Sequence, residues 1–224
     1  MAAGESPESM KSEPVHAPVP RPLAGAKSTL PRVLWLLGAS ALAAACSSTA
    51  PTTFDLTAPR QRAGGGGAIG GQVVVAEPTA IQTFEADRII VKDPNGSVSF
   101  LGGGQWADRL PRLVQARLIQ TFENSSRIRA VSRPGDRITA DYQLNTELRA
   151  FQISTGSKEA LVEISAKVVN DKSGRIGAAR VFTARVPVAT IDAPNAAQAL
   201  DKALSTVLLQ IVRWVGAGGT GGQA

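Results

Sequence analysis

Histidine and cysteine are almost absent from this sequence. Its 224 residues include one histidine, His16, and one cysteine, Cys46. Both precede residue 72, where we expect the folded domain to begin. Histidine is the usual proton-exchanging side chain near neutral pH, and a single cysteine has no partner for an internal disulfide. Ser-His-Asp and Cys-His nucleophilic arrangements and the common zinc sites are therefore excluded.

Paired carboxylates and phosphate-binding loops are also absent. The carboxylates are scattered without the spacing typical of acid-base catalysis or metal binding, as at Asp87, Asp108, Asp136, Asp141 and Glu163. We interpret them as solvated surface charges. Residues 102–104 and 216–222 are glycine-rich but lack the Gly-Lys-Ser/Thr pattern of nucleotide-binding loops. The sequence predicts a protein that is not an enzyme and that uses no metal and no cofactor.

The longest apolar run is too short for an ordinary membrane span. It covers residues 33–45, about 13 residues, whereas a spanning helix needs roughly 20. Arg32 precedes the run and small residues lead into Cys46, which is the pattern of a bacterial secretory signal with a lipobox. Ala43 stands where leucine is usual. We predict Cys46 as the site of lipid attachment; the alternative is a buried helix or a lone membrane anchor with an incidental cysteine.

Composition divides the chain into four parts. Residues 1–45 are expected to be a signal peptide with a long N-terminal region, which starts at Met1 or Met10. Residues 46–71 are rich in Ser, Thr, Pro and Gly and predict a flexible tether. Residues 72–215 contain the periodic segments of one domain. The glycine-rich residues 216–224 predict a disordered tail.

Short strand signals open the domain. Val73–Val75 form an apolar run typical of a buried strand. Asn95-Gly96 separates two β-rich segments, 88–92 and 97–101, and this is the strongest short-range signal of a hairpin. We expect the glycines at 102–104 to end the second strand. Residues 128–131 predict one more short strand.

Three longer segments then alternate apolar and polar residues, at 138–150, 160–168 and 176–186. Each predicts a strand with one buried and one solvated face. Short turns join them, which predicts an antiparallel meander. The alternation changes phase at Ala150-Phe151, and this change indicates a β-bulge.

Two segments, about 106–123 and 195–215, carry apolar residues at helical spacing. Pro111 fits the first helix only close to its first turn, because proline has no amide hydrogen to donate. Asn195 and Gln198 resemble a capping box at the start of the second helix. The expected fold is α+β, a mostly antiparallel sheet with two amphipathic helices packed on one face.

Arginines are frequent between the first helix and the meander: Arg109, Arg112, Arg117, Arg127, Arg129, Arg133 and Arg137. They form either a solvated face or a docking surface for acidic protein or lipid head groups. If they form a docking surface, Arg127, Arg129 and Arg133 are the candidate contacts. The polar face of residues 141–149 is a second candidate. Aromatic residues make up 4% of the chain and are not interleaved with these charges, so nucleic-acid binding is disfavoured.

The order of motifs resembles the ABC-type transport auxiliary lipoproteins, which accompany Mce-domain lipid-transport systems. The resemblance covers about residues 46–215 and rests on the lipobox, Thr53-Phe54-Asp55-Leu56, the segment 86–92, and Gln105-Trp106-Ala107-Asp108-Arg109-Leu110 at the start of a helix. Phe54 replaces the common tyrosine, and the glycine-rich insertion after Arg62 departs from the family pattern.

This resemblance implies a non-enzymatic auxiliary component of a transporter that moves phospholipid or another lipid between membranes. Its expected partners are an Mce-domain substrate-binding protein with a permease and an ATPase, and a membrane reached through the lipid anchor. Ser47 after the cysteine favours the periplasmic face of the outer membrane under the enterobacterial sorting rule. The alternative is a structural or regulatory envelope lipoprotein that binds a cell-wall enzyme or oligomerises. A free edge of the meander can support a homo-oligomer in either case.

Overall fold

Strand β7, Tyr142–Ser154, runs through the middle of the domain and follows the clearest alternating pattern of the sequence. Leu144 and Leu148 point into the core. The register shifts between Leu148 and Ala150, so the predicted bulge is confirmed. Strand β8 pairs along one edge of β7, and β2, β3 and β4 pair with successive parts of its other edge.

The computed structural model describes residues 50–60, 69–125 and 128–219. Its elements in chain order are β1 (Thr52–Phe54), β2 (Ile69–Val75), β3 (Thr79–Ala80), the 3-10 helix η1 (Gln82–Phe84), β4 (Arg88–Lys92), β5 (Val98–Trp106), α2 (Leu110–Asn124), β6 (Ile128–Ser132), β7, β8 (Glu159–Asn170), β9 (Ile176–Pro187), α3 (Ala193–Trp214) and a π-helical turn η2 (Val215–Gly219).

The two predicted antiparallel units are confirmed. β7, β8 and β9 pair in order as a meander, and β4 pairs with β5 as a hairpin. In the hairpin turn, the Asn95 side chain accepts a hydrogen bond from the amide of Ser97 at 2.9 Å, and Gly96 has a φ of 88°. Local turn chemistry at Asn95-Gly96 therefore favours the hairpin.

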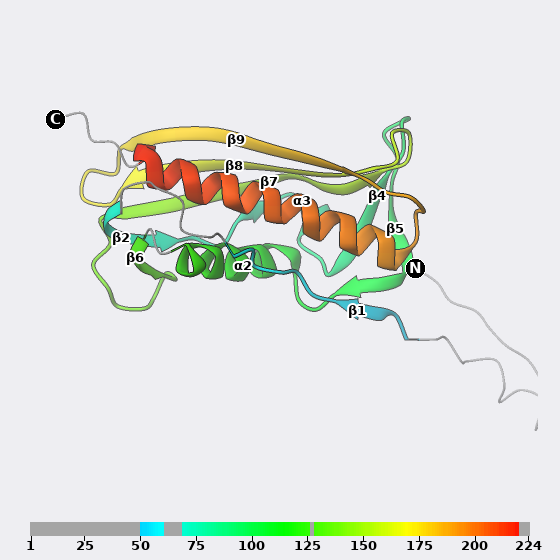
Figure 1. The fold of residues 1–224 in the computed structure, drawn as a ribbon, viewed down its shortest axis with the longest axis horizontal. Coiled ribbons are helices and arrows are strands. Elements are labelled where there is room, and N and C mark those ends of the chain that lie inside the picture. Colours follow the sequence, from blue (N-terminus) through cyan, green and yellow to red (C-terminus); the bar gives the residue numbers. More distant parts are fainter. Residues whose placement is uncertain (1–49, 61–68, 126–127, 220–224) are drawn as a thin grey trace, which may run out of the picture. The chain divides into compact units, whose positions relative to one another are not determined.

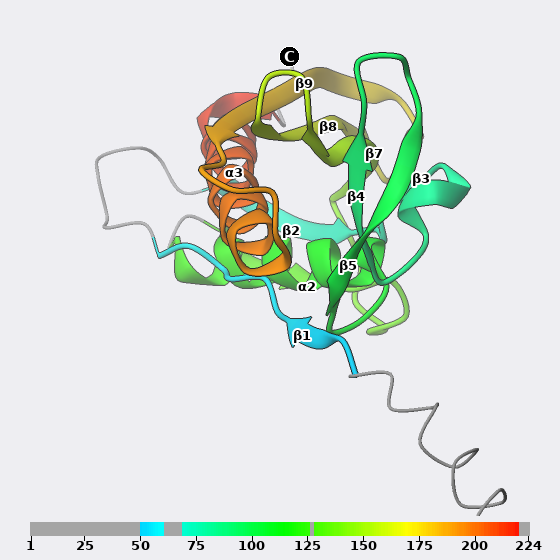
Figure 2. The same ribbon diagram turned by 90° about the vertical axis from the view of Figure 1, so that its right-hand side faces the viewer.

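The expectation of a mostly antiparallel sheet is wrong, because the sheet is mixed. β2, β3 and β4 each pair in parallel with successive parts of β7, at residues 142–144, 147–148 and 153–154. β1 and β5 are parallel, as are β2 and β6. Figure 1 shows these strands together with the long meander, and Figure 2 shows the curl of the sheet from one end. The parallel partners of β7 lie far from it in the sequence and are not joined to it by short turns. No turn motif in the sequence therefore predicts these pairings.

The two predicted helices are present, and their apolar residues lie in the core. α3 packs along β8 and β9, α2 packs against β2 and β6, and the two helices contact each other. α2 begins at Leu110 with Pro111 in its first turn, as expected. Trp106 was expected in this helix but ends β5, because the strand continues through the glycines at 102–104. Its ring packs edge-on against Phe151, with centroids 5.7 Å apart.

The start of α3 is capped by Asp192, not by the predicted pair of Asn195 and Gln198. The Asp192 carboxylate accepts a hydrogen bond from the amide of Asn195 at 2.9 Å. Pro194 follows in the first turn, where its missing amide hydrogen is not needed. The cap therefore lies at Asp192, three residues before the predicted position at Asn195.

Part of the segment expected to be a tether belongs to the fold. β1 pairs with β5, and Leu56 is 2% exposed within the hydrophobic core. The Thr57 amide and hydroxyl both donate to the Asp201 carboxylate on α3, at 2.7 and 2.8 Å. β2 likewise begins at Ile69 instead of residue 72. At the other end, η2 extends regular structure to Gly219, beyond the expected boundary at 216.

Candidate functional site

Arg109, the residue before α2, and Arg117 within α2 form ion pairs with other segments of the domain. The Arg109 guanidinium lies 2.7 Å from the carboxylates of both Glu77 and Glu85. Arg117, whose side chain is 17% exposed, pairs with Asp55 just after β1. Exposed ion pairs contribute only about 0–1 kcal/mol each. They connect the segments next to β1 and β3 to the helix.

The structure describes only part of the predicted docking surface of Arg127, Arg129 and Arg133. Arg127, like the predicted lipid-attachment residue Cys46, lies outside the described residues, and the Arg129 side chain is also outside the described part. Arg133 is exposed in the turn after β6, where its amide donates to the Asp136 carboxylate at 2.7 Å. A docking surface built from these three arginines therefore stays a prediction.

The other predicted candidate, the polar face of β7, continues onto β8. Asn145 lies opposite Lys167, and Glu147 lies opposite Ser165. Directly opposed residues on an antiparallel pair project to the same side of the sheet. Two strands therefore present amide, hydroxyl, carboxylate and ammonium groups side by side.

This polar face borders a depression where β7 changes partners. The amide of Ala76, after β2, donates to the carbonyl of Leu144 at 3.1 Å, and β3 takes over at Thr79, which pairs with Glu147. Between these points the Thr79 hydroxyl reaches the Thr146 carbonyl at 3.4 Å. The open depression measures about 230 Å³.

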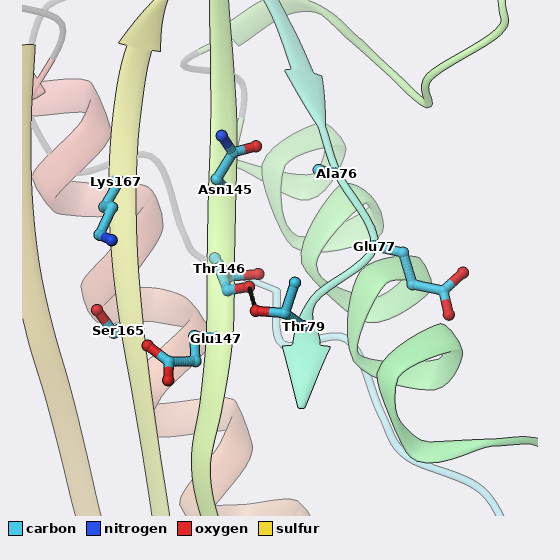
Figure 3. Close-up of a pocket in the computed structure, with 8 residues that line it drawn as sticks. All are labelled: Ala76, Glu77, Thr79, Asn145, Thr146, Glu147, Ser165 and Lys167. Carbon is cyan, nitrogen blue, oxygen red and sulfur yellow. Dashed lines mark hydrogen bonds between the residues drawn. The ribbon is translucent and has the colours of Figure 1, made fainter. Parts of the chain in front are cut away.

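Figure 3 shows how the surrounding side chains lie. The depression is lined by Ala76, Glu77, Thr79, Asn145, Thr146, Glu147, Ser165 and Lys167. Glu147 also approaches the Nε of Arg149, at 3.4 Å. In the described part of the chain, no carboxylate lies within 4.0 Å of the Lys167 ammonium. The Lys167 charge is thus available to a carboxylate from outside.

The arrangement suits recognition of a polar chain segment. It offers hydrogen-bond donors and acceptors together with charges of both signs. Among the residues that the structure describes, no group of three or more His, Cys, Asp or Glu residues is placed to hold a metal ion. Alternation in β7 predicted the contribution of Asn145 and Glu147. It did not predict Ser165, Lys167 or the β2–β3 segment, because alternation does not identify a strand's neighbours.

None of the described helices combines the length and the apolar character needed to cross a membrane.

A family model described as the ABC-type transport auxiliary lipoprotein component matches residues 54–212. The chain belongs to this family. The match begins within β1, which agrees with the place of β1 and Leu56 in the fold. The family comprises lipoproteins that assist transport and is not a known class of enzymes.

Similar proteins include an uncharacterized protein from Bradyrhizobium diazoefficiens, 32% identical over 166 residues. That alignment covers 72% of this chain but 44% of the relative, so the chain spans less than half of the relative's length. The crystal structure of protein XCC0632 from Xanthomonas campestris is 27% identical, covers 74% of this chain and 94% of that one, and superposes with a TM-score of 0.69. A second crystal structure, of an uncharacterized protein, is 11% identical with a TM-score of 0.58 and shares the fold; it covers 74% of this chain and 98% of that one.

Proposed function

We propose that this protein is a non-enzymatic, lipid-anchored auxiliary component of an Mce-type ABC transport system that moves phospholipid or another lipid between membranes. Family membership supports a role in transport. Its partners would be the Mce-domain substrate-binding protein, the permease and the ATPase. Cys46 would carry the acyl chains and hold the domain at the periplasmic face of the outer membrane.

Within this system, contact with protein is a better role for the domain than carriage of lipid. Helix α3 directs its apolar residues inward, and Leu200, Leu204 and Leu208 are 0% exposed. Leu118 and Phe122 of α2 are equally buried. A lipid tail needs an apolar cavity or groove, and these helix faces are already covered by the sheet.

The observation that carries this proposal is the polar depression at the β7–β8 face. Lys167 and Asn145 lie next to the β7 edge between β2 and β3. An extended segment of the Mce-domain protein that carries a carboxylate would meet both a cation and amide groups there. Charged contacts of this type raise the association rate and make it sensitive to salt.

Site-specific photocrosslinking in membranes tests this proposal. A photoreactive residue at Glu147 or Lys167, both exposed, should capture an Mce-domain protein. The matched control is Lys172, exposed in the β8–β9 turn and away from the depression. Capture of wall-synthesis enzymes alone from positions 147 and 167 would favour the alternative function. Equal capture from all three positions would remove the β7–β8 face from the proposal.

The arginine surface needs a separate test. Reversal of Arg127, Arg129 and Arg133 to Glu should weaken recovery of the Mce-domain protein if these residues dock it. Arg213, exposed near the end of α3, is a matched control for charge reversal. Unchanged recovery in the triple variant, with reduced recovery in Lys167→Glu, would assign docking to the β7–β8 face.

A structural envelope lipoprotein that oligomerises is the second candidate. Strand β9 pairs only with β8 among the described strands, and Val181 on β9 is 44% exposed. Such an edge is a template for pairing with another chain. Sedimentation of Val181→Lys against the parent protein tests it: an oligomer that dissociates in the variant supports pairing through β9, and a parent protein that is monomeric excludes it.

A further inference from the structure

The β4–β5 hairpin exposes large apolar side chains. Val98 is 48% exposed and Phe100 is 52% exposed. They stand two residues apart on β5 and therefore project to the same side of the hairpin. Beyond them, Gly102 and Gly103 face open space, with nothing within 4 Å of the position a Cβ would occupy. The bulge at these glycines separates this outer part of the hairpin from the end of β5 that pairs with β1.

Two cations share the face of Val98 and Phe100. Lys92 lies directly opposite Val98 and therefore projects to the same side of the hairpin. The Arg88 guanidinium lies over the Phe100 ring, 5.4 Å from its centroid. Apolar side chains bordered by cations match the boundary between acyl chains and anionic head groups.

The neighbouring turn adds to this charge. The β7–β8 turn approaches the hairpin turn so closely that a Cβ on Gly156 would lie 2.7 Å from the Pro94 side chain. This turn carries the exposed Lys158. The nearby Asp93 carboxylate accepts a hydrogen bond from the Thr155 hydroxyl at 2.6 Å and is partly buried.

The segment that follows Cys46 joins the domain at the same strand, β5. β1 pairs in parallel with Gly104–Trp106 of β5. The first described residue, Ala50, follows Cys46 by four residues, a span of at most about 14 Å. Figures 1 and 2 show that β1, the hairpin and the start of α3 share one end of the domain, while the β8–β9 turn lies at the opposite end. An acyl chain on Cys46 would therefore hold the hairpin end next to the bilayer.

We propose that Val98 and Phe100, with Arg88 and Lys92, form a lipid-contact surface that rests on the anionic membrane in which Cys46 is anchored. The inference rests on the proposed acylation of Cys46. It defines the orientation of the domain: the hairpin faces the membrane, and the β8–β9 turn faces away from it.

Depth-dependent fluorescence quenching tests this orientation. The protein is purified from membranes, acylation of Cys46 is verified by mass spectrometry, and the protein is placed in vesicles of phosphatidylethanolamine and phosphatidylglycerol. Tryptophan is introduced by Phe100→Trp or, in a second variant, by Val98→Trp. Brominated acyl chains should quench both. Ile176→Trp is the control, since Ile176 is 59% exposed at the far end of the domain, and it should not be quenched.

The two native tryptophans that follow Cys46 provide a steady background, because Trp106 is 1% exposed and Trp214 packs against Phe182. Replacing phosphatidylglycerol with phosphatidylcholine, or introducing Arg88→Gln with Lys92→Gln, should reduce the quenching at position 100. No quenching at positions 98 and 100, or equal quenching at 176, overturns the proposal. A concentration-dependent emission shift of Phe100→Trp in lipid-free detergent would assign the surface to a second copy of the chain instead.

These outcomes are separate from the proposed transport function. A protein that is acylated and captures an Mce-domain partner but shows no quenching at position 100 refutes the orientation alone. A protein that shows quenching at position 100 but captures no such partner retains the membrane contact and loses the transport proposal.

Discussion

Gly104 lies where β1, β5 and the start of α3 meet. A Cβ at this position would lie 2.6 Å from the Cβ of Ala193 and 2.7 Å from the Phe54 ring. Glycine is required here by the close approach of neighbouring segments and not by an unusual backbone angle. The same residue thus allows β1 and the start of α3 to pack against one strand.

Gly104→Ala should lower the free energy of unfolding by about 1–3 kcal/mol, the usual cost of overpacking. Urea unfolding followed by circular dichroism measures it. Gly102→Ala, two residues earlier, is the control, because its added Cβ meets nothing within 4 Å. Equal stability of the two variants would contradict the packing at β1.

The Asp192 side chain caps the start of α3. Asp192→Ala should lower the free energy of unfolding by about 0.5–2 kcal/mol, because the amide of Asn195 loses its acceptor. Thermal unfolding compares this variant with Asp171→Ala in the exposed β8–β9 turn. If the two variants have the same midpoint, the capping role is wrong.

Residues 52–57 were predicted to be part of a flexible tether, but they belong to the folded domain. It lies in a stretch of Ser, Thr, Pro and Gly, and only Phe54 and Leu56 are large and apolar. Its structure comes from distant partners: β5, Arg117 of α2 and Asp201 of α3. Composition predicted a tether because it reports local preference and contains nothing about these partners.

Leu56→Ala should lower the free energy of unfolding by about 2–5 kcal/mol, the range for a buried leucine. Thr53→Ala, at an exposed position in β1, should have almost no effect. Urea unfolding of both variants measures the contrast. A small effect of Leu56→Ala would indicate that residues 52–57 act as a tether and contribute little to the stability of the domain.

The elements that could be predicted are those with local signals. Asn95-Gly96 predicted the hairpin, and the phase change at Ala150 predicted the bulge. The parallel pairings could not be predicted, because alternation shows which face of a strand is buried but not which strand lies beside it. The candidate site was half predicted for the same reason: Asn145 and Glu147 belong to one alternating strand, whereas Lys167 comes from its neighbour.

The proposed acylation of Cys46 would decide where the whole protein works. Cys46→Ser should leave the protein unprocessed or free in the periplasm, because the acceptor of the acyl chain is lost. Labelled fatty acid should enter the parent protein and a Ser47→Ala control but not Cys46→Ser. Equal labelling of all three would remove Cys46 from the proposal.

The position of β7 also sets the order in which the strands can pair during synthesis. Val73 pairs with Tyr142 and Val91 pairs with Ile153, so β2 and β4 have no partner on β7 until more than sixty further residues have emerged. Such long-range parallel pairing is slow, and until it forms, the edges of β2 and β4 that face β7 can pair with other chains. The first half of this domain therefore cannot complete its sheet before β7 has been synthesised.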